Sequence, residues 1–317
     1  MWRSLLVALM VTMPAPAQEP KKVDPPKKPA GIAPTHADVP YGPHPRQVVD
    51  AFLARSDRPT PVVIAIHGGG WNTGSKDSYR TSAKRYLDAG VSVVAINYRM
   101  VPEATEKKVE PPVSWPLSDA ARAVQFVRSK AKEWNLDPTR VGATGGSAGA
   151  CSSLYLLYHD DFADPKSTDP VARLSTRLSC AAVTGAQTTL DPHTCREWMP
   201  NARYGGHAFG VTAKNNRDGA FGEFHKRRDE LLPWIKTYSP IEHVSKDDPP
   251  VFMDYPAQKK PPVKGEAQDD PTHSALYGMI LMEKLKTVGV EGILSYPGQP
   301  HEKYKGIVEY LTDRLKK

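Results

Sequence analysis

Short apolar runs alternate with longer helix-like stretches along most of this chain, and no other feature limits its possible folds as strongly. Buried strands are expected where β-branched and small apolar residues run together, at residues 61–66, 91–97, 140–145 and 179–186. Helices are expected between them, at residues 75–90, 116–135 and 148–159. Because parallel strands need long crossover connections, this order predicts an α/β fold with a mostly parallel sheet and helices on both faces.

The alternating pattern lapses between about residues 187 and 248 and then returns. Within the lapse, only the run ELLPWIKTY at 230–238 is helix-like. After it, strands are expected at 249–255 and 290–298 and helices at 273–289 and 302–317. A long irregular segment inside a compact domain commonly forms a lid or a substrate-binding element. We therefore predict one domain over residues 46–317, with an insertion after the fourth strand.

The N-terminal residues have the composition of an export signal followed by a leader. Residues 1–17 combine a short positive start, the apolar run LLVALMVTM and a small-residue Ala-Pro-Ala site, which is typical of a signal peptide. Residues 18–45 are rich in proline and lysine and nearly free of large apolar side chains, so a disordered leader is expected. These features predict a secreted or periplasmic protein.

Charge and cysteine content exclude several classes of function. The formal net charge of +7 comes partly from lysines of the predicted leader, and no basic stripe with interleaved aromatic residues indicates nucleic-acid binding. No internal apolar run is long enough to span a membrane. Three cysteines are too few for a disulfide scaffold and too dispersed for a zinc motif. No metal or organic cofactor is expected. Cys151 is expected to be buried, and pairing of Cys180 with Cys195 stays open.

The segment Gly-Gly-Ser-Ala-Gly at residues 145–149 matches G-x-S-x-G at the junction of an expected strand and an expected helix. In that position a sharp turn between glycines presents the serine hydroxyl at the end of the sheet. A glycine-serine turn alone is common, but the strand before it and the helix after it favour Ser147 as a nucleophile.

A second glycine-rich segment, HGGGW at residues 67–71, follows the first expected strand. Acyl transfer places negative charge on a carbonyl oxygen, and closely approaching backbone N–H groups stabilise that charge. We expect the N–H groups of Gly69, Gly70 and Ala148 to form such an oxyanion hole. His67 is expected to hold the loop.

Two tryptophans are candidate walls of a substrate pocket: Trp71 beside the glycine loop and Trp198 in the insertion. Either would serve equally well as a core aromatic residue.

The motifs HGGGW, NYRMVPEA at residues 97–104 and GGSAG, in this order and spacing, resemble the α/β-hydrolase superfamily. Within it, the chain is similar to carboxylesterases related to hormone-sensitive lipase and to bacterial secreted esterases and acetylhydrolases. The resemblance covers residue 61 to the C-terminus and implies the α/β-hydrolase fold. It also implies that the YRxxPE residues support the active-site loops; these residues are Tyr98, Arg99, Pro102 and Glu103.

The resemblance implies a catalytic acid and then a histidine after Ser147 in the chain. His301 directly follows the last expected strand and is the predicted base, with His273 and His243 as competitors. The acid is expected at Asp270, counted back from the helix before the last strand. Other acids of this region remain open: Asp269, Glu266 and Asp254.

Together these features predict a secreted serine carboxylesterase that acts on short-chain or carbohydrate-linked acyl esters through a Ser-His-Asp triad. The expected partner is a small-molecule or polysaccharide-linked ester, with no nucleic acid and no transmembrane segment. A secreted serine peptidase of the same fold and a non-catalytic binding protein are the alternatives. The sequence leaves the oligomeric state open.

Overall fold

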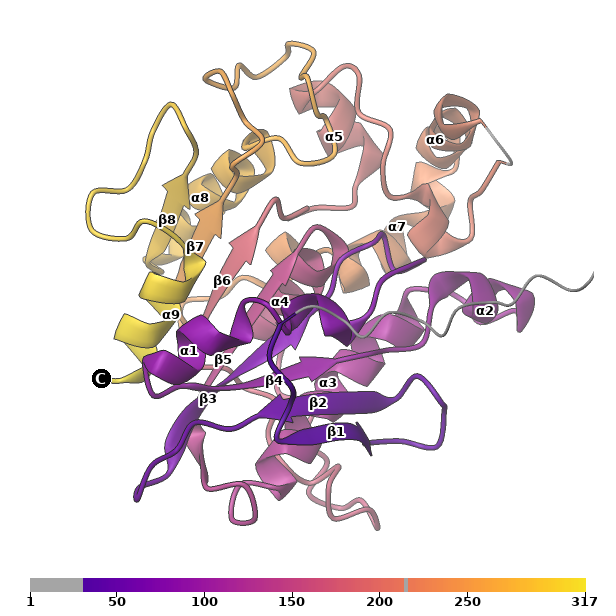
Figure 1. Cartoon of the computed structure of the whole chain (residues 1–317). Coiled ribbons are helices and arrows are strands. Elements are labelled where there is room, and N and C mark those ends of the chain that lie inside the picture. Colours follow the sequence, from indigo (N-terminus) through magenta and orange to yellow (C-terminus); the bar gives the residue numbers. More distant parts are fainter. Residues whose placement is uncertain (1–30, 214–215) are drawn as a thin grey trace, which may run out of the picture.

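The computed structural model describes residues 31–213 and 216–317, and within them the chain folds around one sheet of eight strands (Figure 1). The strand order across the sheet is β1-β2-β4-β3-β5-β6-β7-β8. The strands are β1 (His36–Pro40), β2 (Val48–Phe52), β3 (Thr60–Ile66), β4 (Ser92–Ile96), β5 (Leu136–Gly146), β6 (Cys180–Thr184), β7 (Val251–Asp254) and β8 (Gly292–Ser295). From β4 to β8 all neighbours are parallel, whereas β1 and β2 form an antiparallel edge. The predicted mostly parallel sheet is confirmed.

Helices cover both faces of the sheet, as the alternating pattern predicted (Figure 1). The α-helices are α1 (Ala83–Asp88), α2 (Val101–Glu106), α3 (Ser114–Ser129), α4 (Ala148–Tyr158), α5 (Pro192–Trp198), α6 (Arg217–Lys226), α7 (Arg228–Tyr238), α8 (Leu276–Val288) and α9 (Ile307–Leu315). Short 3₁₀ helices are η1 (Lys76–Tyr79), η2 (Gly206–Phe209) and η3 (Pro240–His243). No helix in the described part of the chain is long and apolar enough to cross a membrane.

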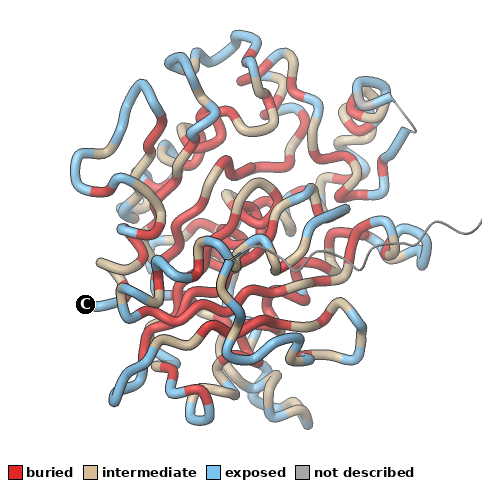
Figure 2. The backbone as a smooth tube through the Cα atoms, viewed as in Figure 1, coloured by how far each residue is buried: buried red, intermediate tan, exposed pale blue. Residues whose placement is uncertain are grey.

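The core lies on both sides of the central strands, which are buried along their length (Figure 2). Alternate residues of β3 serve the two sides: Ile64 belongs to the cluster that contains residues of α3, α4 and α8, whereas Val63 belongs to the cluster that contains residues of α1 and α9. A strand buried on both faces needs a continuous apolar run. This explains why β3, β4, β5 and β6 could be located from sequence.

The N-terminal edge corrects the predicted leader, because residues 31–45 include β1 and are part of the fold. β1 is short and mostly exposed, so it lacks the apolar content of a typical strand. The next strand, β2, carries a fully buried Asp50, which pairs with Lys76 at 2.7 Å and Arg80 at 2.9 Å. This aspartate interrupts the apolar pattern and concealed β2. The predicted signal peptide, residues 1–17, and the leader residues 18–30 lie outside the described residues.

Between β6 and β7 the chain forms α5, η2, α6, α7 and η3 instead of an irregular loop. Of these, only α7 was expected. Their apolar residues are isolated in sequence but converge in space: Trp198, Phe209, Phe221 and Phe224 are buried together with the main core. The elements α5 and α6 lie beyond the C-terminal ends of the strands (Figure 1). This position places the insertion over the end of β5 that carries Ser147.

The three cysteines are all buried and unpaired. Cys180 lies on β6 in the cluster that faces α9, whereas Cys195 lies on α5 in the cluster on the other face of the sheet. The sheet therefore separates the two thiols, and the pairing left open by the sequence is not made.

Candidate active site

Ser147 occupies a sharp turn between β5 and α4. Its backbone has φ +53° and ψ −122°, a conformation that is strained for a residue with a side chain. The flanking glycines permit the turn: a Cβ on Gly149 would lie 2.0 Å from the carbonyl oxygen of Ile66, and one on Gly145 would lie 2.3 Å from the backbone of Gly149. The Ser147 N–H donates to the carbonyl of Thr184 at 3.0 Å. The turn thus fixes the hydroxyl at the end of the sheet.

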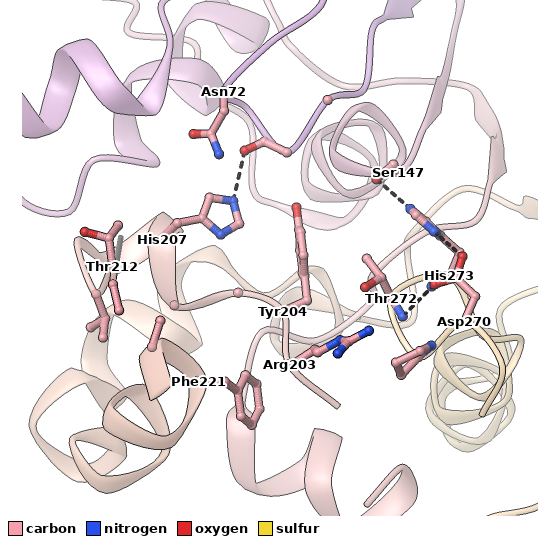
Figure 3. Close-up of a pocket in the computed structure, with 18 of the residues that line it drawn as sticks. Asn72, Ser147, Arg203, Tyr204, His207, Thr212, Phe221, Asp270, Thr272 and His273 are labelled. Carbon is pink, nitrogen blue, oxygen red and sulfur yellow. Dashed lines mark hydrogen bonds and ion pairs between the residues drawn. The ribbon is translucent and has the colours of Figure 1, made fainter. Parts of the chain in front are cut away.

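The histidine at this hydroxyl is His273, which lies in the turn that precedes α8 (Figure 3). Its Nε2 lies 2.9 Å from Ser147 Oγ, and its Nδ1 lies 2.8 Å from Asp270 Oδ2. An ionised carboxylate only accepts hydrogen bonds, so Nδ1–H donates to Asp270 and leaves Nε2 free to accept from the serine. The three side chains form a continuous hydrogen-bonded chain.

The turn around Asp270 also holds its carboxylate. The backbone N–H groups of Thr272 and His273 donate to Asp270 Oδ1 at 3.0 and 3.2 Å. Partial burial raises the pKa of Asp270, but the hydrogen bonds and the nearby imidazole outweigh it, so the pKa lies below its ordinary value. The carboxyl group is therefore ionised at neutral pH and available to orient the imidazole.

The structure corrects the prediction of His301 as the base. The loop after β8 turns back through paired backbone hydrogen bonds between Tyr296 and Gln299. His301 then stacks on Tyr304, with ring centroids 5.4 Å apart, and meets the edge of Phe252. It therefore packs on the α9 side of the sheet and takes no part in the Ser147 hydrogen bonds. Position after the last strand was a misleading signal.

A more local signal was available in the sequence. Asp270 and His273 are separated by Pro271 and Thr272 only, so one turn brings an acid and a base together. The competitor His243 lies on η3, where Nε2 contacts the carbonyl of Thr237.

The other acids considered from sequence occupy different surroundings. Asp254 is the last residue of β7. Burial raises its pKa, and a hydrogen bond from the Tyr255 backbone opposes this shift without cancelling it. Asp269 lines the same cavity as Ser147, but its neighbour Asp270 holds His273. Glu266 is exposed. The structure thus brings Ser147 and Asp270 together through His273.

The predicted oxyanion loop lies beside Ser147. Gly69 and Gly70 have φ +99° and +62° and line the same cavity as the serine. Ala148 is the first residue of α4, where helix geometry leaves the N–H without an intrahelical acceptor. Gly69 and Gly70 thus lie on the cavity that holds the serine, and Ala148 directly follows it in the chain; their role as oxyanion donors stays a prediction.

Trp71 joins this loop to the nucleophile helix. Its indole Nε1–H donates to Ser152 Oγ at 3.0 Å, and the Ser152 hydroxyl donates to the carbonyl of Ala148 at 2.9 Å. Trp71 is fully buried and does not line the cavity. The prediction that Trp71 forms a pocket wall is therefore wrong.

Trp198 is likewise a buried core residue, with Lys264 over its ring at 4.3 Å, and it does not line the cavity. The predicted pocket wall at Trp198 is corrected for the same reason. The insertion instead lines the cavity with Arg203, Tyr204, His207 and Phe221 (Figure 3).

His67 supports the oxyanion loop from below. It stacks on Tyr98 at 4.2 Å, and its Nδ1 lies 2.8 Å from the carbonyl oxygen of Gly68. Burial lowers the pKa of His67 to about 4, although the hydrogen bond to Gly68 opposes this shift. The ring is therefore neutral at pH 7, and Nδ1–H donates to the Gly68 carbonyl.

The YRxxPE residues lie around this loop. The Tyr98 hydroxyl donates to the carbonyl of His67 at 2.8 Å. Arg99 pairs with buried Asp119 at 2.6 Å, and Glu103 contacts His44 at 3.1 Å. Pro102 lies in the first turn of α2, so these residues brace the segments behind the glycine loop.

A cavity of about 600 Å³ opens over Ser147 and His273. Its floor is the glycine loop, and its walls come from the insertion and from the turn with Asp270 (Figure 3). Many polar groups face it: Asn72, Thr73, Arg203, Thr212, Asp269 and Thr272. No group of three metal-ligating side chains occurs among the described residues.

Comparison with known families decides the classification. The sequence model of the BD-FAE family matches residues 49–259, about two thirds of the chain. The chain belongs to the BD-FAE family. The matched region includes the glycine loop and Ser147 but ends before Asp270 and His273, so this family resemblance alone does not locate the acid and the base.

Individual relatives match the chain over a shorter region than the family model does. Gut esterase 1 of Caenorhabditis elegans is 38% identical over 96 residues, which cover 29% of this chain and 17% of that protein. The chain thus matches well under two thirds of this relative's length.

Solved structures resemble the chain over most of its length. An acetyl ester-xyloside bifunctional hydrolase from Caldicellulosiruptor lactoaceticus has a TM-score of 0.62 at 23% identity and covers 86% of this chain and 88% of its own. A truncated carbohydrate esterase from gut microbiota has a TM-score of 0.64 at 17% identity and covers 89% of this chain and 96% of its own. At these identities the likeness establishes the fold, which is the α/β-hydrolase fold.

Proposed function

We propose that this BD-FAE family member is a serine carboxylesterase, with Ser147 as nucleophile, His273 as general base and Asp270 as the orienting acid. The observation that carries the proposal is the hydrogen-bonded chain of 2.9 Å and 2.8 Å from Ser147 through His273 to Asp270, three residues that line one open cavity. A serine hydroxyl becomes nucleophilic when a base accepts its proton, and the base needs a partner that fixes its orientation.

The reaction proceeds in two halves. Ser147 Oγ bonds to the ester carbonyl carbon while His273 Nε2 takes its proton, and the N–H groups of Gly69, Gly70 and Ala148 stabilise the oxyanion. The bond to the alcohol oxygen then breaks, and His273 returns the proton to that oxygen. Water next attacks the acyl-enzyme, giving its proton to His273. Collapse of this second intermediate releases the carboxylic acid, and the proton returns to Ser147.

The proposed substrates are short-chain or carbohydrate-linked acyl esters. The polar lining of the cavity supports an alcohol that carries several hydroxyl groups. The two fold neighbours, an acetyl ester-xyloside bifunctional hydrolase and a carbohydrate esterase, support the same class.

We also propose export of the protein, on the composition of residues 1–17. N-terminal sequencing of the protein recovered from outside the cytoplasm is expected to begin at Gln18. An intact Met1 in that fraction contradicts cleavage.

A fluorophosphonate probe tests the nucleophile directly, because it forms a covalent bond with an activated serine as fluoride leaves. The wild-type protein is expected to be labelled at Ser147, located by peptide mass mapping, and to hydrolyse p-nitrophenyl acetate. Ser147→Ala is expected to lose both properties while remaining folded. Undiminished ester hydrolysis by Ser147→Ala contradicts the proposal, and a wild-type protein without labelling or hydrolysis supports a binding protein instead.

A further inference from the structure

A second, smaller hollow also reaches Ser147 and His273. Its volume is about 340 Å³, and it is lined by Gly68, Gly146, Thr184, Gly185 and the segment 255–257, in addition to the serine and histidine themselves. The larger cavity shares only Ser147 and His273 with it. The reacting atoms therefore stand at the meeting point of two separate spaces.

The smaller hollow offers little for a hydroxylated group to bind. Three of its residues are glycines, and Pro256 and Ala257 add only carbon side chains. The hydroxyl of Tyr255 is already used, since it donates to the carbonyl of Ala186 at 2.9 Å, so this residue presents its ring. The Thr184 carbonyl accepts from the Ser147 N–H. Polar groups moved from water into this space would lose hydrogen bonds, whereas an alkyl chain would gain from burial.

The oxyanion loop fixes how an ester spans the two spaces. Gly69 and Gly70 line the larger cavity and not the smaller one, so the carbonyl oxygen points toward the larger side. Two substituents then leave the carbonyl carbon, and each needs a space that begins at Ser147 Oγ. The polar cavity suits the alcohol, and the apolar hollow suits the acyl chain.

The loop after β8 contributes no residue to the lining of the smaller hollow. That loop packs His301 against Phe252 and Tyr304, while the base comes from the turn before α8. Ala257, an exposed residue with a small side chain, lies at its wall.

We infer that the hollow formed by Gly68, Gly146, Thr184, Gly185 and 255–257 is the acyl subsite, which takes short alkyl chains while the alcohol occupies the larger polar cavity. This inference rests on the proposed function. It makes Ala257 a determinant of acyl length, because a larger side chain there shortens the space available to the chain.

The test is a series in which Ala257 is replaced by Val, Leu and Phe, assayed on p-nitrophenyl acetate, butyrate and hexanoate. The ratio of kcat/KM for butyrate to that for acetate is expected to fall with side-chain size, by about tenfold or more at Ala257→Phe. Fluorophosphonate labelling of Ser147 reports that each variant keeps an assembled site. If Ala257→Phe does not fold, the Val and Leu variants give the same trend at smaller size.

The matched control is Ala220→Leu, which adds bulk to α6 in the wall of the larger cavity. It is expected to leave the butyrate-to-acetate ratio within about twofold of wild type and to raise KM for acetylated xylo-oligosaccharides. An unchanged ratio across the Ala257 series, or a ratio that changes in Ala220→Leu instead, overturns the subsite assignment. Either result still leaves a working esterase, whereas loss of the proposed function itself appears as ester hydrolysis by Ser147→Ala.

Discussion

Gln187 holds the turn that carries both Asp270 and His273. Its side chain is fully buried, and Nε2 donates to the carbonyls of Thr272 at 2.6 Å and Gly185 at 3.2 Å. Thr272 lies between the acid and the base, and Gly185 directly follows β6. The Gln187 amide therefore holds the turn of the acid and the base against the end of β6.

Replacement of Gln187 by Met keeps the approximate size but removes both donors. We expect kcat to fall about tenfold with little change in KM, and stability to fall by about 1–3 kcal/mol because two buried carbonyls lose a partner. The matched control is Gln125→Met, since the amide of buried Gln125 donates to the carbonyls of Ala172 and Leu174 away from the site. Steady-state kinetics and urea unfolding measure both effects; an equal loss of kcat in the two variants contradicts a positioning role for Gln187.

The pKa of Asp270 lies below its ordinary value and that of Asp254 lies above it, so the two carboxyl groups change the stability of the fold with pH in opposite ways. A carboxyl group with a lowered pKa, like Asp270, stabilises the fold above its ordinary pKa and loses that contribution as the pH falls through its folded value. A carboxyl group with a raised pKa, like Asp254, has the opposite effect and costs stability as the pH rises through its folded value.

We therefore expect Asp254→Asn to raise Tm at pH 7, with a smaller gain at pH 4, and to keep its activity. Asp270→Asn is expected to lower Tm at pH 7 and to reduce kcat by about 100-fold or more, since the imidazole loses its orienting carboxylate. Thermal unfolding at the two pH values and p-nitrophenyl acetate kinetics measure these changes. A loss of activity in Asp254→Asn as large as that in Asp270→Asn would assign the acid to β7 instead.

At the scale of elements, the oxyanion loop and α4 are joined through one side-chain bridge. Trp71 adopts φ +56°, which is unfavourable for a bulky residue, and its indole hydrogen bond to Ser152 holds it there. The Ser152 hydroxyl in turn donates to the carbonyl of Ala148. The bridge therefore connects Trp71, the neighbour of Gly70, to Ala148, and Gly70 and Ala148 are two of the three proposed oxyanion donors.

Trp71→Phe and Ser152→Ala are each expected to lower kcat by about tenfold, and the double variant is expected to lose little more than either single variant. The coupling between them should reach about 1 kcal/mol, as for a hydrogen bond between neutral groups. Ser153→Ala is the control, because Ser153 makes the equivalent bond to Gly149 at 2.8 Å in the same helix. A double-mutant cycle in kcat measures the coupling, and strictly additive effects contradict the bridge.

Elements also differ in how well the sequence predicted them. The strand β3 and the helix α4 are predictable because all their residues are buried, so each shows a continuous run of apolar and small residues in the sequence. By contrast, β2 depends on ion pairs between Asp50 and residues of η1 and its C-cap, Lys76 and Arg80, which no local pattern reveals. For the base, the position of His301 after the last strand is a weaker signal than the closeness of Asp270 and His273 within one turn, where their side chains lie 2.8 Å apart.

At the scale of the whole molecule, stability comes from two apolar clusters on opposite faces of the sheet and requires no covalent link. Cys180 and Cys195 lie in different clusters, and burial raises the pKa of both thiols to about 12. Both are therefore protonated and protected in the folded protein.

We expect Tm to be the same with and without dithiothreitol. A thiol reagent is expected to modify all three cysteines only after unfolding in urea, which mass spectrometry can count. A lower Tm under reducing conditions, or a mass two hydrogens short, would establish a disulfide and contradict the described arrangement.

We propose that the base for Ser147 comes from the turn before α8. Comparing His273→Ala with His301→Ala in kcat/KM for p-nitrophenyl acetate tests it most directly, because both variants truncate a histidine and only one contacts the serine. We expect His273→Ala to lose about 1,000-fold or more and His301→Ala to stay within about threefold of wild type. A large loss confined to His301→Ala, with His273→Ala still active, would contradict the account.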